Sequence, residues 1–181
     1  GQVAFFVMIT ILIFQFFNKE KIKSLLIVIA LLPVIFFSAY HTSDIFNSRV
    51  SAAIEESVNF SEYADQKTEY TSVGLRISFA INSWEVIKKN TFIGVGTGDF
   101  PLEYNKINAI KTPHLLNQLG PTTNPHNMYT LVLVQLGLFG MISLLSIFYY
   151  QLKLSTLSNN RFFRDLGLAL PIIFLVLMIS D

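Results

Sequence analysis

Long apolar stretches without a charged residue alternate along this chain with shorter polar segments. A helix that crosses ~30 Å of hydrocarbon needs about 20 apolar residues. The uncharged stretches are Gly1–Phe17, Ser24–Tyr40, Met128–Tyr150 and Leu166–Ser180. We therefore predict an all-α fold, a multi-pass transmembrane helical bundle with four spans.

The connecting segments indicate how these spans are oriented. Asn18–Lys23 and Gln151–Asp165 are short and rich in lysine and arginine, so the positive-inside rule places both in the cytoplasm. The long polar segment His41–Asn127 then lies on the opposite side. The predicted organisation is two spans over residues 1–40, one large helical extracytoplasmic loop over 41–127, and two further spans over 128–181.

Composition agrees with a membrane protein. Of the 181 residues, 52% are hydrophobic and only 14% are charged, which is more apolar than an ordinary soluble domain. A net charge of +1 gives no reason to expect nucleic acid as a partner, and without cysteine the loop has no disulfides. There is no starting methionine, and Asp181 directly follows an apolar run. We expect both ends to be cut from a longer protein.

The first half of the loop gives a weak helical signal. Ser43–Ile54 has apolar residues at Ile45, Val50 and Ile54 that would face inward on a short helix. The stretch Ser57–Ser72 has no clean period, and we expect it to be mobile.

A clearer helix is predicted over Thr71–Lys89. Ser72 suits its N-cap, and Lys88 and Lys89 suit its C-terminal end, where the helix dipole favours cations. Trp84 suits a headgroup interface, so we expect this helix to lie on the outer membrane face. Its apolar positions on one side are Leu75, Phe79, Val86 and Ile87.

Three alternate glycines follow in Phe92-Ile-Gly-Val-Gly-Thr-Gly-Asp-Phe100. Bare backbone N–H groups of such a loop can approach an anion, so Gly96 and Gly98 are candidates for contact with substrate. The spacing is not that of a dinucleotide-binding fingerprint. The alternative is a tight turn in which the glycines supply positive φ.

The second motif is Thr122-Thr-Asn-Pro-His-Asn-Met-Tyr129, before the third predicted span. Asn124 suits an N-cap and Pro125 the first helical position, which places His126 in the first turn. There the helix dipole opposes protonation of the imidazole, and free N–H groups can bind an anion. A neutral histidine beside an anion site could act as a general base. Alternatively, His126 merely caps the helix or forms an interfacial hydrogen bond.

Three motifs occur in an informative order along residues 74–150. They are Arg76 in Gly74-Leu-Arg-Ile-Ser-Phe-Ala-Ile-Asn-Ser-Trp84, the glycine turn, and Pro125-His-Asn-Met-Tyr129 followed by Gln135-Leu-Gly-Leu-Phe-Gly140. This order resembles the O-antigen ligase and polymerase superfamily of bacterial membrane glycosyltransferases. The resemblance implies a multi-pass protein of the bacterial plasma (inner) membrane, with residues 41–127 on the extracytoplasmic side.

The resemblance also implies a reaction, in which a glycan moves from a polyprenyl-diphosphate carrier to an acceptor hydroxyl. The partners would be the lipid-linked glycan donor, a glycan or lipid-linked acceptor, and membrane lipids. By resemblance, His126 would be the catalytic histidine and Arg76 would bind the diphosphate. A fixed guanidinium can fork onto phosphate oxygens, and the loop has no Asp-x-Asp pair, so we expect neither a metal nor a cofactor. Further candidate substrate-binding residues are Arg49, Lys88, Gly96, Gly98, Asn127 and Tyr129.

Two other classes of function stay open. One is a polysaccharide or lipid transporter whose outer loop acts as a gate. A transporter is expected to carry ionisable groups inside its spans, and the four uncharged stretches have none. The other is a membrane anchor whose loop binds a partner, which leaves the three ordered motifs without a reason. Gly137 and Gly140, inside the third predicted span, would allow the close approach of another helix.

Overall fold

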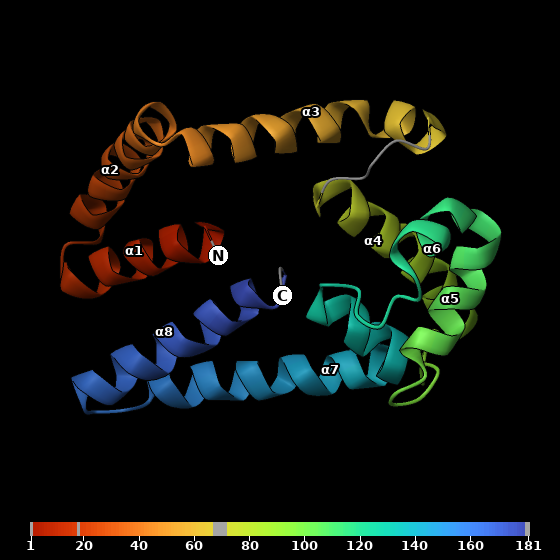
Figure 1. The fold of residues 1–181 in the computed structure, drawn as a ribbon. Helices are drawn as coiled ribbons and strands as arrows, with labels where there is room; N and C mark the ends of the chain where they lie inside the picture. Colours follow the sequence, from red (N-terminus) through yellow and green to blue (C-terminus); the bar gives the residue numbers. More distant parts are fainter. Residues whose placement is uncertain (1, 18, 67–71, 180–181) are drawn as a thin grey trace. The chain divides into compact units, whose positions relative to one another are not determined.

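The computed structural model describes residues 2–17, 19–66 and 72–179. This part of the chain consists of helices joined by irregular segments. Figure 1 shows the order of its helices. They are α1 (Gln2–Phe16), α2 (Lys21–Thr42), α3 (Asp44–Gln66), α4 (Ser72–Lys89), α5 (Phe100–Lys111), α6 (Pro113–Leu119), α7 (Met128–Thr156) and α8 (Arg161–Leu177). The predicted all-α fold is confirmed.

Two of these helices are long and apolar enough to cross a membrane, namely α2 with 22 residues and α7 with 29. Helices α1 and α8 are apolar but shorter, with 15 and 17 residues. The described residues therefore contain two candidate spans, and the first and fourth of the predicted spans stay predictions.

The chain divides into two compact units. The first consists of Gly1–Val58 and Gln151–Leu177, and in it α1 packs against both α2 and α8. Polar contacts join the ends of α1 and α8: Gln15 Nε2 donates to the Asp165 carbonyl at 2.6 Å, and Arg161 donates to the Gln15 carbonyl at 3.0 Å.

Helix α3 differs from the sequence expectation. It runs from Asp44 to Gln66, so the stretch expected to be mobile is helical up to Gln66, and residues 67–71 lie outside the described part. Ile45 and Ile54 are 70% and 61% exposed, so the prediction that they face inward is wrong. Long helices form without an apolar period when their residues have adequate helix propensity, and the period then does not mark the helix.

The second unit, Asn59–Tyr150 with Met178–Asp181, contains the hydrophobic core. Helix α4 confirms the prediction over Thr71–Lys89 in its described part, and its Phe79, Val86 and Ile87 are buried. Leu75 packs against them as predicted. The remaining core residues come from α5 and α7, namely Phe100, Tyr104 and Val134.

A buried polar network lies beside this core and joins α4 to α5 and α6. Asn82 Nδ2 donates to Thr112 Oγ1 at 2.7 Å and to the Tyr104 hydroxyl at 3.4 Å, and Thr112 Oγ1 donates to Asn108 Oδ1. Burial raises the pKa of Tyr104 to about 12, so its hydroxyl stays protonated. Satisfied buried polar groups fix the register of packed helices, because a shift would leave them without partners.

Candidate functional site

The first wall of the candidate site is one face of α4. Leu75, Arg76 and Phe79 lie within about one turn of this helix and line a common pocket. Phe79 is anchored in the core, where its ring contacts Tyr104 edge-to-face at 6.0 Å. Arg76 is exposed, and among the described residues it has no ion-pair partner.

The opposite wall is an irregular segment that follows α6, and Asn105 of α5 holds it in place. Asn105 Oδ1 accepts from the Thr122 backbone N–H at 2.9 Å, and its Nδ2 donates to the Thr122 carbonyl at 3.0 Å. The same Nδ2 donates to the Pro101 carbonyl at 2.6 Å. One side-chain amide thus satisfies both backbone groups of Thr122, as a neighbouring strand would.

His126 adopts an unusual backbone conformation at the end of this segment. Its φ of +52° is the only positive value at a non-glycine position in the described residues. The Asn124 side chain stabilises this turn by accepting from the His126 backbone N–H at 2.9 Å. Residues held in the left-handed region cluster at functional sites, because the surrounding structure must maintain the strain.

The start of α7 corrects the sequence prediction for this motif. The N-cap is Asn127, whose Oδ1 accepts from the Thr130 N–H at 2.9 Å, and not Asn124. His126 therefore precedes the helix, and the argument from the helix dipole does not apply to it. The Met128 N–H donates to the Met178 carbonyl at 2.9 Å, so two of the N–H groups expected to bind an anion are occupied. An asparagine at either position suits a cap, so the sequence left the two readings equally good.

Asn127 has a second structural contact. Its Nδ2 donates to the Ile179 carbonyl at 3.0 Å, while its Oδ1 caps α7. Both ends of the amide are thus engaged with the protein itself, immediately after His126.

The glycine turn lies against a break in α7. Four backbone groups of α7 near the break have lost their helical partners, and each bonds to the turn instead. Val95 N donates to Val134 O (2.8 Å), Gly96 N to Gln135 O (2.9 Å), Leu138 N to Thr91 O (2.8 Å) and Phe139 N to Phe92 O (3.2 Å). The turn therefore completes the hydrogen bonding of the interrupted helix.

This contact requires glycine on both sides. Gly137, at the break, has φ +62°, and Gly94, in the turn, has φ +75°. A Cβ on Gly137 would lie 2.4 Å from the Phe92 carbonyl group, and a Cβ on Gly94 would lie 2.4 Å from the Gln135 carbonyl group. Gly137 thus allows the close approach of the glycine turn, whereas the sequence suggested the close approach of another helix. The reading of the glycine segment as a tight turn is confirmed.

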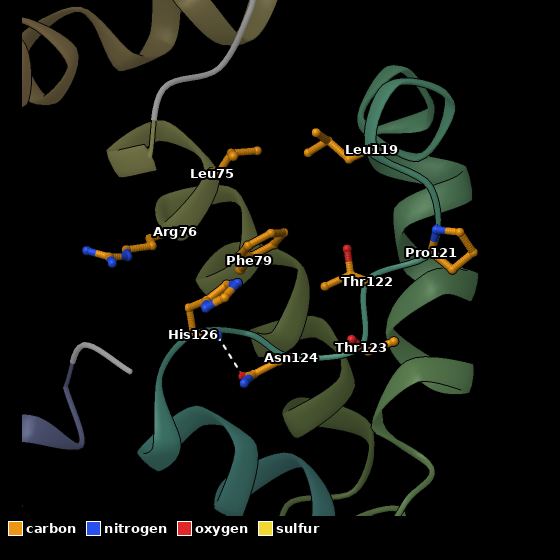
Figure 2. A pocket seen from close by; sticks show the side chains of 9 residues that line it. All are labelled: Leu75, Arg76, Phe79, Leu119, Pro121, Thr122, Thr123, Asn124 and His126. Carbon is orange, nitrogen blue, oxygen red and sulfur yellow. Dashed lines mark hydrogen bonds between the residues drawn. The ribbon is translucent and has the colours of Figure 1, made fainter.

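The walls enclose a pocket of about 470 Å³, shown in Figure 2. The His126 imidazole points toward Phe79 and stacks on its ring, with centroids 5.9 Å apart and planes at 29°. The Arg76 side chain extends away from Phe79 on the outer side of α4. The pocket is lined by Leu75, Arg76, Phe79, Leu119, Pro121, Thr122, Thr123, Asn124 and His126. No carboxylate is among these residues, so the lining favours an anionic or neutral polar ligand.

Two of the predicted site residues, Arg76 and His126, line this pocket, although the Arg76 side chain extends away from Phe79 (Figure 2). The other predicted site residues are not among its lining residues. Lys88 is at the C-terminal end of α4, where it pairs with Glu85 at 2.9 Å. Arg49 belongs to α3, in the first unit. Tyr129 lies in the first turn of α7 and Asn127 at its cap, while Gly96 and Gly98 belong to the turn.

Sequence reasoning missed Phe79 and the pair Thr122 and Thr123 as pocket residues. The position of Phe79 on the apolar side of α4 indicated a core residue, which it also is. The two threonines directly precede the Asn-Pro-His run, and this proximity was the only signal for them. Their hydroxyl groups can both donate and accept hydrogen bonds, as the hydroxyl groups of a sugar require.

Among the described residues, no group of three or more His, Cys, Asp or Glu side chains is placed to hold a metal ion. That the reaction needs no metal stays a prediction. Glu85 forms ion pairs with Lys111 and Lys88, which lower the pKa of its carboxyl to about 2.

Comparison with known proteins places this arrangement in a family. No curated protein matches the chain at a significant level. The family model described as O-antigen ligase matches residues 1–145, which include every residue that lines the pocket. Because the match covers well over half of the 181 residues, the chain belongs to the O-antigen ligase family, whose members are embedded in membranes.

Proposed function

We propose that this chain is part of a membrane glycosyltransferase that moves a glycan from a polyprenyl-diphosphate carrier to an acceptor hydroxyl. The reaction would take place at the outer face of the plasma membrane. The observation that carries the proposal is that Arg76 and His126, on separate elements 50 residues apart, line the same pocket. Membership of the O-antigen ligase family supports the class of donor and acceptor.

Arg76 has the properties required of a diphosphate ligand. It is exposed, it has no ion-pair partner among the described residues, and no carboxylate lines its pocket. A guanidinium stays charged at every physiological pH and can donate two parallel hydrogen bonds to phosphate oxygens. As the glycosidic bond breaks, negative charge grows on the departing diphosphate, and a cation in place stabilises that charge.

His126 would act on the acceptor. A ring nitrogen removes the proton of the acceptor hydroxyl while its oxygen forms the new bond to the anomeric carbon. The bond from that carbon to the phosphate oxygen breaks, and its electron pair leaves with the polyprenyl diphosphate. The Phe79 ring fixes the plane of the imidazole, and none of the residues drawn in Figure 2 hydrogen-bonds its ring nitrogens.

The backbone of His126 provides a clean test of this role. Glycine adopts the left-handed conformation with about 1 kcal/mol less strain than histidine. In His126→Gly this gain offsets the loss of roughly 0.5–1.5 kcal/mol of ring stacking. We therefore expect a folded protein with normal thermal stability and a large loss of glycan transfer. Added imidazole is expected to restore part of the activity, because it can occupy the space that the side chain leaves.

The assay is transfer from a polyprenyl-diphosphate donor by the full-length protein in membranes, with surface polysaccharide scored in a strain that lacks the gene. His114→Ala, a histidine outside the pocket in the same unit, is the matched control. If His126→Gly retains the wild-type rate, His126 is not the base and the proposal fails.

Arg76 is tested by Arg76→Ala and Arg76→Lys, with Lys89→Ala as a control cation on the same helix. We expect Arg76→Ala to raise the KM for the donor and to lower kcat, and Arg76→Lys to recover only part of either loss. A single ammonium cannot reproduce the planar fork of a guanidinium. Equal activity in Arg76→Ala and Lys89→Ala would contradict the assignment.

A further inference from the structure

The contact between the glycine turn and α7 lies inside an apolar helix. Gly137 is roughly 13 Å from the start of α7 at Met128, counted at 1.5 Å per residue. The uncharged stretch continues past it to Tyr150. Because α7 is a candidate span of a membrane-embedded family, its break falls within the span and not at either end.

Irregular backbone is tolerated at membrane depth only where its polar groups are satisfied by protein. The four hydrogen bonds between Thr91–Gly96 and residues 134–139 meet this condition for the groups that the break leaves unpaired. Since these partners come from the turn, the turn lies at the same depth as the break.

The side chains of the turn are suited to hydrocarbon. Phe92 and Ile93 are 63% and 77% exposed, and Phe139, exposed on α7 beside them, contacts the Phe92 ring at 6.4 Å. Residues 90–98 contain no charged side chain, and the first charge after them is Asp99, at the N-cap of α5. The nearest cations, Lys88 and Lys89, end α4 just before the turn, where their long stems can reach headgroups.

We propose that the glycine turn is a re-entrant element, in which Phe92 and Ile93 enter the hydrocarbon of the leaflet that holds the first turns of α7. Lipid chains cover these two side chains, while Lys88 and Lys89 remain in the headgroup layer. In the orientation proposed above this is the outer leaflet. The turn would then hold the second unit, with its pocket, at a fixed depth in the membrane.

The depth is measured with a nitroxide label on a single cysteine. This chain has no cysteine, so Ile93→Cys introduces one label site, and any cysteine elsewhere in the full-length protein is replaced by serine. The matched control is Ile110→Cys on α5, which is 79% exposed and followed by Lys111. Both variants are reconstituted into phosphatidylcholine vesicles, and collision of the label with oxygen and with a water-soluble nickel chelate is measured.

Oxygen concentrates in hydrocarbon and the nickel chelate in water. We expect the label at position 93 to collide mainly with oxygen, and the label at position 110 mainly with the nickel chelate. Phe92→Cys should follow position 93. The proposal is overturned if position 93 is as accessible to nickel as position 110, or if neither reagent reaches it, which would mean that protein covers it.

This measurement does not require glycan transfer. An inactive protein with a lipid-exposed label at position 93 would contradict the proposed function alone. An active protein with a water-exposed label would contradict the re-entrant turn alone.

Discussion

The ring of Phe79 stacks on the imidazole of His126, with centroids 5.9 Å apart. Phe79 is 7% exposed and belongs to the core of the second unit, whereas His126 is exposed in the pocket. The stack therefore connects a residue of fixed position to the proposed base. Activity should depend on the shape of residue 79 even though its side chain has no reactive group.

We expect Phe79→Leu to lower kcat about tenfold with little change in the KM for the donor, because a tilted imidazole misplaces the attacking hydroxyl. The loss of stability should be about 1 kcal/mol, since most of the apolar volume is kept. Phe79→Tyr keeps the ring and should recover kcat. Steady-state kinetics and thermal unfolding check this, and an unchanged kcat in Phe79→Leu would show that the stack has no positioning role.

Because Gly94 and Gly137 lie in contact, we predict that one added methyl group at either position causes a large loss of stability. Gly94→Ala and Gly137→Ala each place a Cβ 2.4 Å from a carbonyl group, so the turn must leave the break and expose unpaired backbone groups. Gly98→Ala is the control. Its φ of +91° is also strained for alanine, but a Cβ there has no neighbour within 4 Å.

We expect the first two variants to lose several kcal/mol of stability and to accumulate poorly in membranes, and Gly98→Ala to lose only about 1 kcal/mol. Thermal unfolding in detergent compares the three variants directly. Similar losses in all of them would mean that backbone strain, and not the contact, explains the effect.

Asn105 supports the pocket wall through the two backbone groups of Thr122. Asn105→Ala leaves both groups without that partner, and we expect a loss of about 1–3 kcal/mol in the free energy of unfolding. Transfer activity should fall further than stability alone explains, because Thr122 and Thr123 line the pocket. Asn117→Ala, an exposed asparagine on α6, is the control and should change neither quantity.

The pairing of Glu85 with Lys111 and Lys88 predicts a dependence of stability on acid. The pKa of Glu85 falls from 4.5 to about 2 on folding, so its contribution to stability is fully present above pH 4.5. The contribution is lost as the pH falls toward 2, when the carboxylate is protonated. Glu85→Gln should be less stable than the wild type at pH 7, and the difference should shrink between pH 4.5 and 2 in thermal unfolding. A constant difference over that range would contradict the pairing.

The sequence by itself determined the features that depend on local pattern. The apolar face of α4 follows from the spacing of Leu75, Phe79, Val86 and Ile87, because a helix buries one side. Its end at Lys89 follows from the cations Lys88 and Lys89, which the helix dipole favours at that end. The uncharged length of Met128–Tyr150 predicted a span, and α7 is long and apolar enough to be one. The order of Arg76, the glycine turn and His126 predicted the family, and it named the two candidates, Arg76 and His126, that line one pocket in the structure.

Only the tertiary structure decided the rest, because those features depend on partners far along the chain. The break at Gly137 forms where Thr91–Gly96 supplies the missing hydrogen bonds, and no period within α7 reveals it. The choice of Asn127 over Asn124 as N-cap also involves Ile179, which holds the other end of the Asn127 amide. Local spacing determines which residues can be buried and which can cap a helix. Where spacing allows several packing partners or caps, contacts between distant segments select one of them.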